Sequence, residues 1–236
     1  MKRSTLFSLA TILLLIPATL FLGMQLSGRW YYLTGTLIIL ETMLPFFMSF
    51  EQRRPQAREL VMIAVMAAIA TVSRAAFSFL PHFKPITAII MITGIAFGAE
   101  AGFLTGAIAA FASNFIFGQG PWTPWQMMAY GMAGFLAGVL LYSRRLPGKP
   151  LLNTLLLSVF GLVAVVCAIG PLLDCCTIFT TPAVITPAFV FTVLAAGLPV
   201  NAAHGLGCAV TMVLFSRPLL SKLERLKIKY GLLDHK

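Results

Sequence analysis

The chain has 236 residues, of which 59% are apolar and only 10% are charged, and its mean hydropathy is +0.92. A water-soluble domain of this composition would have too little polar surface, so we expect an integral membrane protein. The net charge of +10 could suggest a nucleic-acid partner. However, the basic residues gather in short loops, as membrane topology and anionic lipid headgroups require, and we expect no nucleic-acid partner.

Long continuous apolar segments predict membrane-spanning helices, because barrel strands would give short alternating segments instead. The fold class that we expect is therefore all-α. The predicted spans cover residues 6–26, 31–50, 60–79, 86–98, 102–117, 125–142, 151–173 and 187–215.

The fourth and fifth spans are separated only by the segment from Phe97 to Gly102. One helix over residues 86–117 would be about 48 Å long, whereas the hydrocarbon core of a bilayer is roughly 30 Å thick. We therefore predict a turn at Glu100.

The basic residues test this turn, because short cytoplasmic loops collect Lys and Arg. With the turn in place, 14 of the 17 basic residues lie on one side of the membrane. Only Arg29 and Lys84 lie on the other side, and Arg74 lies within a span. Both termini are therefore predicted to be cytoplasmic.

The predicted spans divide the chain into four parts. These are an N-terminal transmembrane hairpin (1–50), a polar cytoplasmic linker (51–59), a six-span core (60–216) and a basic cytoplasmic tail (217–236). Within the core, glycines recur every four residues, which predicts close approach of helix backbones. They are Gly94, Gly98, Gly102, Gly106, Gly134 and Gly138.

The segment from Phe117 to Gln126 is a polar, aromatic, turn-forming loop between two apolar helices, and it predicts the mouth of a binding pocket at a membrane surface. Asn114, Gln119 and Gln126 can hydrogen-bond a ligand or satisfy helix ends. Trp122, Trp125 and Tyr130 can stack on a planar ligand or belong to an interfacial belt.

Arg74 is a charge within a span, so it either faces a ligand or partner, or extends along its helix to the interface. Asn201 and His204 lie in the last span, where an interhelical hydrogen bond is the default role. His82 and Lys84 lie in the loop after the third span, where solvation is the simplest expectation.

An intramembrane enzyme is the competing class. No Gly-x-Ser-x-Gly, His-Glu-x-x-His or paired membrane aspartates occur, and a phosphate-binding Gly-x-x-x-x-Gly-Lys-Ser/Thr loop is also missing from the sequence. The four cysteines show no metal-binding spacing. We therefore predict no catalytic residue, no metal site and no enzyme.

Several segments together resemble the S component of energy-coupling factor (ECF) transporters. The resemblance covers about residues 59–215. It rests on the Ala64-x-x-x-Ala68 spacing, the loop from Phe79 to Pro85, the hairpin from Phe97 to Gly102, and Ser113-Asn114-Phe115 leading into the segment from Phe117 to Gln126.

This resemblance implies a six-helix core that captures a small molecule from outside and topples in the prokaryotic cell membrane. It implies three partner subunits, namely one transmembrane scaffold and two ATPases that use ATP, and no cofactor of its own. Ala64, Ala67 and Ala68 would meet the scaffold. The N-terminal hairpin departs from the family pattern.

The loop from Phe117 to Gln126, with Phe83-Lys84-Pro85 before it, looks most similar to S components assigned to cobalamin and its precursor cobinamide, so the resemblance implies cobalamin as the ligand. Other vitamins and a queuine-like nucleobase are the alternatives. A metal ion is not expected as the substrate, because the N-terminal segment contains no His. The expected substrate-binding residues are Arg74, Phe79, His82, Lys84, Asn114, Gln119, Trp122, Trp125, Gln126, Tyr130 and Asn201.

Overall fold

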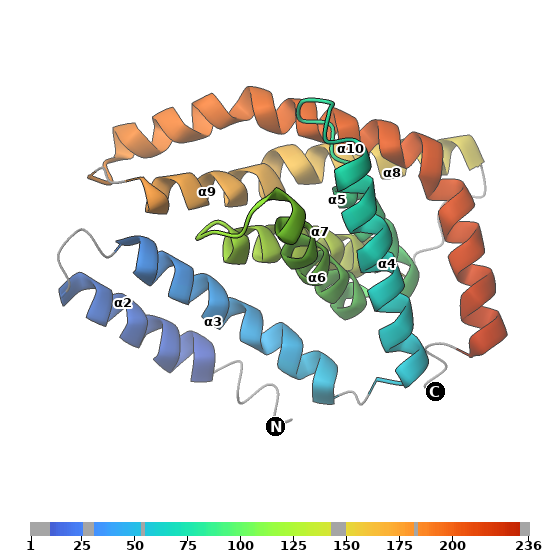
Figure 1. Ribbon diagram of the computed structural model, residues 1–236, viewed down its shortest axis with the longest axis horizontal. Helices are drawn as coiled ribbons and strands as arrows, with labels where there is room; N and C mark the ends of the chain where they lie inside the picture. Colours follow the sequence, from blue (N-terminus) through green and yellow to red (C-terminus); the bar gives the residue numbers. More distant parts are fainter. Residues whose placement is uncertain (1–9, 26–30, 53–54, 143–149, 182–183, 232–236) are drawn as a thin grey trace.

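The computed structural model describes residues 10–25, 31–52, 55–142, 150–181 and 184–231, and over these residues it contains helices and no strand, as the sequence predicts. The elements in chain order are the π-helical turn η1 (Thr11–Leu15), α2 (Ile16–Gln25), α3 (Tyr31–Gln52), α4 (Ala57–Ala76), α5 (Ile86–Phe97), α6 (Ala99–Phe117), α7 (Thr123–Leu141), α8 (Pro150–Ala164), the π-helical turn η3 (Val165–Ile169), α9 (Gly170–Thr180) and α10 (Pro187–Tyr230). Figure 1 shows their arrangement.

Among the described residues, five helical segments are long and apolar enough to cross a membrane. They are Leu33–Gln52, Ala57–Ala76, Ala99–Phe117, Pro150–Thr180 and Pro187–Tyr230. Helix α5 has only 12 residues, or about 18 Å of helix. It is almost completely buried between other helices, so it need not meet lipid along its length.

Glycine packing holds α5, α6 and α7 together at the centre of the bundle. A methyl group on Gly94 or Gly102 would collide with the backbone carbonyl of Gly134, and one on Gly106 would collide with the carbonyl of Tyr130. The predicted close approach of these backbones is therefore confirmed.

The predicted turn between the fourth and fifth spans is also confirmed, but it lies at Gly98 rather than at Glu100. Gly98 has φ of +96°, a conformation that residues with a Cβ rarely adopt, and α6 begins at the next residue. Glu100 is already in the first turn of α6, and it accepts a hydrogen bond from Ser49 of α3.

The last two helical segments are longer than predicted. Helices α8 and α9 are joined through η3 and continue to Thr180, and α10 is a single helix of 44 residues with Pro199 and Pro218 inside it. Figure 1 shows α10 running beside α8 and α9 and then bending toward the start of α4. Pro218 explains a bend there, because proline disrupts the helical hydrogen-bond pattern.

Residues 217–230, which the sequence analysis places in the cytoplasmic tail, are therefore helical. Leu223 is buried in the main core, and the guanidinium of Arg58 donates to the backbone carbonyl of Tyr230. Lys227 lies 3.5 Å from the carbonyl oxygen of Ala96, near the Gly98 turn. Arg58, in the first turn of α4, and the described basic residues at the end of α10 thus share one end of the bundle, although which side of the membrane it faces stays a prediction.

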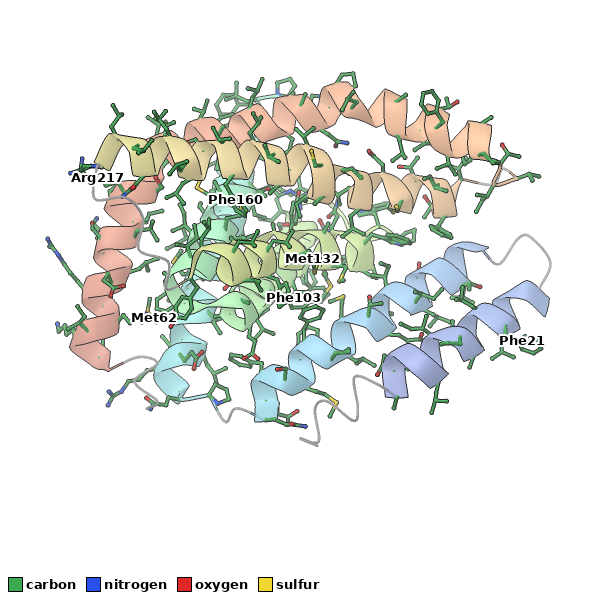
Figure 2. The ribbon with its side chains drawn as sticks, turned by 180° about the vertical axis from the view of Figure 1, so that it is seen from behind. Phe21, Met62, Phe103, Met132, Phe160 and Arg217 are labelled. Carbon is green, nitrogen blue, oxygen red and sulfur yellow. The ribbon has the colours of Figure 1, made fainter. Side chains whose placement is uncertain are left out.

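Helices α2 and α3 pack together, and α3 lies against α6, α7 and α9. The Phe46 ring stacks on Phe103 at 4.1 Å between centroids and meets Phe135 edge-on at 5.0 Å. Figure 2 shows Phe103 and Met132 in the interior and Phe21 on the outer side of α2. Helix α3 extends to Gln52 and α4 begins at Ala57, so both helices enter the predicted 51–59 linker.

Candidate functional site

A hydrogen-bonded polar cluster joins α4, α6 and α7 at the end of the bundle opposite the Gly98 turn. Arg74, in the last turn of α4, donates through Nη1 to the Ser113 hydroxyl at 2.5 Å and to the side-chain Oδ1 of Asn114 at 3.1 Å. The side-chain Nδ2 of Asn114 donates to the side-chain Oε1 of Gln126 at 2.9 Å. The guanidinium carbon also lies 4.6 Å from the centre of the Phe117 ring.

The turn between α6 and α7 completes this cluster. The Thr123 hydroxyl accepts from the Asn114 amide at 3.1 Å and from the Gly120 backbone N–H at 3.2 Å, and it donates to Gln119 at 2.9 Å. Gly118 has φ of +98°, which allows the chain to leave α6 sharply. We call Arg74, Ser113, Asn114, Gln119, Thr123 and Gln126 the polar cluster.

The structure thus brings together four of the predicted site residues, which are Arg74, Asn114, Gln119 and Gln126. Ser113 and Thr123 were not predicted. The position of Thr123 after Gly-Pro-Trp could have indicated it, because hydroxyl side chains at a helix start commonly bond nearby backbone N–H groups.

Trp125 lies inside the protein rather than in an interfacial belt. Its side chain is 3% exposed, and its ring stacks on Phe179 of α9 at 5.4 Å. The indole Nε1–H is buried and has no hydrogen-bond partner among the described residues. An unpaired buried donor is unfavourable, so this N–H is available to a ligand that reaches it.

Tyr130 and Asn201 belong to two separate interhelical contacts. Tyr130 is buried and meets the His204 ring edge-on, and His204 Nε2 lies 2.9 Å from the Thr87 hydroxyl of α5. Asn201 donates to Asp174 of α9 at 2.8 Å. The predicted interhelical hydrogen bonds of Asn201 and His204 are therefore confirmed.

The remaining predicted residues lie in the two loops at this end. Phe79 and His82 are exposed, Lys84 is half-buried, and the exposed ring of Trp122 covers Gly120. Phe77 contacts both Phe79 and Phe83 through its ring. Aromatic surface therefore borders the polar cluster, but no hydrogen bond joins these loop side chains to it within the part of the chain that the structure describes.

The predicted docking alanines lie near the middle of α4. Ala64 and Ala68 are exposed, whereas Ala67 is 2% exposed and packs in the main core. Leu60, Val61, Val65, Ile69 and Val72 are exposed on the same helix. Ala64 and Ala68 are thus available to a partner helix, and Ala67 is not.

Among the described residues, no group of three or more His, Cys, Asp or Glu side chains could hold a metal ion. The polar cluster combines one guanidinium with neutral amides and hydroxyls. Such a set of donors and acceptors suits a neutral ligand that carries amide, imide or hydroxyl groups.

The helical architecture, the apolar spans and the polar cluster at one end define a multi-pass membrane protein with a candidate small-molecule site. The sequence profile of the ECF-type riboflavin transporter S component family matches residues 55–221. This match covers more than half of the chain, and the protein belongs to that family of transport components. No curated protein and no solved structure matches the chain significantly.

Proposed function

We propose that this protein is the substrate-capture subunit of an ECF transporter in the prokaryotic cell membrane. It binds a small vitamin at the polar cluster and works with a transmembrane scaffold and two ATPases. The observation that carries the proposal is that Arg74 is held at this end by neutral partners, next to a turn rich in amide groups. The family match supports the transporter class.

Riboflavin is the first candidate substrate, because the matching family is named for it. Its imide edge and its hydroxyl chain offer both donors and acceptors to Arg74, Asn114 and Gln126. Its flat ring suits the exposed aromatic surface near Phe79 and Trp122.

A corrinoid is the second candidate. The loop from Phe117 to Gln126 resembles S components assigned to cobalamin and cobinamide, and the amide groups of a corrinoid would also suit a cluster with a single cation. The cobalamin expectation therefore stays a proposal beside riboflavin.

Titration of the purified full chain with each ligand tests both candidates. Riboflavin binding is followed by its own fluorescence, and cobinamide binding by its visible absorbance. Saturable binding of one ligand, lost on Arg74→Gln, would support capture at the polar cluster and identify the substrate. If neither ligand binds while the scaffold and ATPases still copurify, both substrate candidates are wrong and the transporter class stands.

A further inference from the structure

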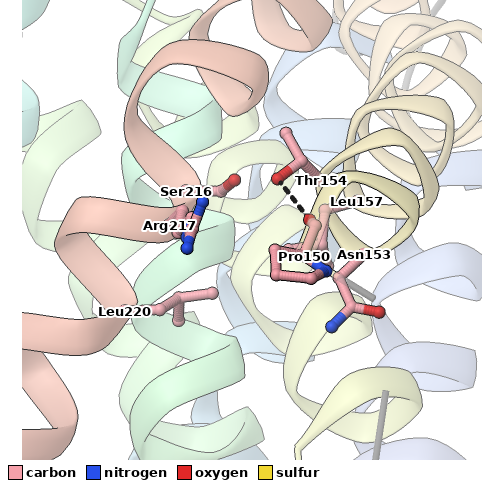
Figure 3. Close-up of a pocket in the computed structure, with 7 residues that line it drawn as sticks. All are labelled: Pro150, Asn153, Thr154, Leu157, Ser216, Arg217 and Leu220. Atoms are coloured by element: carbon pink, nitrogen blue, oxygen red, sulfur yellow. Dashed lines mark hydrogen bonds between the residues drawn. The ribbon is translucent and has the colours of Figure 1, made fainter. Parts of the chain in front are cut away.

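A cavity of about 270 Å³ lies between the first turns of α8 and the bend of α10 (Figure 3). Helix α8 begins the 31-residue spanning segment Pro150–Thr180, so its first turns lie at the level where lipid headgroups meet the hydrocarbon. The cavity is smaller than the roughly 300 to 1,000 Å³ of typical small-molecule pockets. Its size therefore suits a headgroup better than a whole vitamin.

Two polar atoms of the lining residues are buried without a partner among the described residues. They are the hydroxyl of Ser216, which is 0% exposed, and the carbonyl oxygen Oδ1 of Asn153. The hydroxyl of Thr154, by contrast, donates to the Pro150 carbonyl at 3.1 Å. Native proteins rarely leave buried polar groups unpaired, so these two atoms are available to a group that enters the cavity.

The two unpaired atoms and the cationic side chain of Arg217 require different groups on a bound ligand. Arg217 provides a guanidinium, and Ser216 provides a hydroxyl donor, and both favour a phosphate. The Asn153 oxygen can only accept, so a phosphate alone would leave it unpaired. A hydroxyl group next to the phosphate would satisfy it.

We propose that this cavity binds the headgroup of an anionic phospholipid that carries hydroxyl groups, such as phosphatidylglycerol. The phosphate lies against Arg217 and Ser216, and a glycerol hydroxyl donates to Asn153. Leu157 and Leu220 line the cavity and provide the apolar wall for the glycerol backbone and acyl chains.

Native mass spectrometry of the purified full-length protein, titrated with short-chain phosphatidylglycerol, tests the proposal. Arg217→Gln should weaken binding about tenfold, because it removes charge-assisted hydrogen bonds. Lys222→Gln is the matched control, since it removes the same charge from an exposed position of α10 outside the cavity. Equal losses in the two variants would mean general attraction to the basic end and would overturn the site.

A second comparison tests the hydroxyl contact. The native protein should prefer phosphatidylglycerol to phosphatidylmethanol, which has the same charge but no headgroup hydroxyl, and Asn153→Ala should remove this preference. Equal binding of the two lipids by the native protein would overturn the headgroup assignment. Stabilisation by inorganic phosphate equal to that by phosphatidylglycerol would overturn the lipid as the source of the phosphate.

Discussion

Arg74 is the single residue on which the proposed binding site depends most. An arginine costs about 2.5 to 3.5 kcal/mol at the centre of a spanning helix on insertion scales and less near a helix end, where Arg74 lies, but a partly buried guanidinium there still needs polar partners. It donates hydrogen bonds to the Ser113 hydroxyl and the Asn114 side-chain oxygen, and it lies over the Phe117 ring. None of these neutralises the charge, which is therefore available to polarise a carbonyl group of a ligand.

Replacing Arg74 with Gln should weaken vitamin binding by about 1.5 to 3 kcal/mol, the range for hydrogen bonds to charged groups. Ligand titration of the purified protein measures the change. Arg58→Gln is the control, because Arg58 bonds Tyr230 at the opposite end of the bundle. Equal affinity of the Arg74→Gln variant and the native protein would contradict a ligand contact and favour a role in joining α4 to α6.

The sequence indicated some of these residues and misplaced others for a physical reason. Arg74 and Asn114 could be predicted, because polar groups in spans need partners. The burial of Trp125 could not, because its partner Phe179 lies beyond residue 173, where the predicted span ended. Asp174 likewise lies within α9 and faces Asn201 because the helix continues to Thr180.

Helix ends were harder to predict than helix positions. Apolar runs locate the spans, but polar residues that pair with another helix can extend a helix past its apolar run. Two helices do so: α9 continues past the predicted end at residue 173 to Thr180, and α10 continues past the predicted end at residue 215 to Tyr230. The glycine pattern was more reliable, because a missing Cβ has a direct effect on how closely helices approach.

The close packing of α6 and α7 gives a prediction about a single glycine. In Gly134→Ala the new methyl group would meet the backbone carbonyl of Gly102, which cannot move without moving α6. The variant should lose about 1 to 3 kcal/mol of stability, as overpacked cores do. Thermal unfolding in detergent measures the loss.

Gly161→Ala is the matched control for this prediction. A methyl group there would meet only the Cys208 sulfur at 3.0 Å and the Met212 side chain at 3.5 Å, and side chains can shift. The control should therefore lose less stability. An equal loss in both variants would mean that helix glycines in general, rather than this contact, set the stability.

The exposed face of α4 at Ala64 and Ala68 is the surface that we expect to meet the scaffold. Leucine at Ala64 and Ala68 should weaken assembly with the scaffold, because bulky side chains prevent close helix contact. Ligand binding by the isolated subunit should stay unchanged, because both side chains are exposed. Copurification of the scaffold and ATPase subunits measures assembly, and Ala203→Leu on the exposed surface of α10 is the control. Normal recovery of the complex would exclude this face as the docking surface.

At the scale of the whole molecule, the N-terminal helices are packed onto the family core rather than merely tethered to it. The family match begins at residue 55, after α3. Yet α3 contacts α6, α7 and α9, and its residues Ile39 and Met43 share an apolar cluster with Trp125. Ala64 and Ala68 on α4 remain exposed, so these helices cover one side of the core and leave the proposed scaffold surface open.

This arrangement makes Phe46 a test of how strongly the N-terminal helices are held. Its half-buried ring stacks on Phe103 and meets Phe135, so Phe46→Ala should cost about 2 to 3 kcal/mol, less than the loss of a fully buried Phe. Phe21→Ala, on the outer side of α2, should cost much less, because the Phe21 side chain is 62% exposed. Thermal unfolding of both variants tests this expectation. If α2 and α3 were an independent unit, Phe46→Ala would leave the unfolding midpoint of the core helices unchanged. A lower midpoint for the core would mean that residues before 55 stabilise the site, since the same α3 surface lies against the helix that carries Trp125.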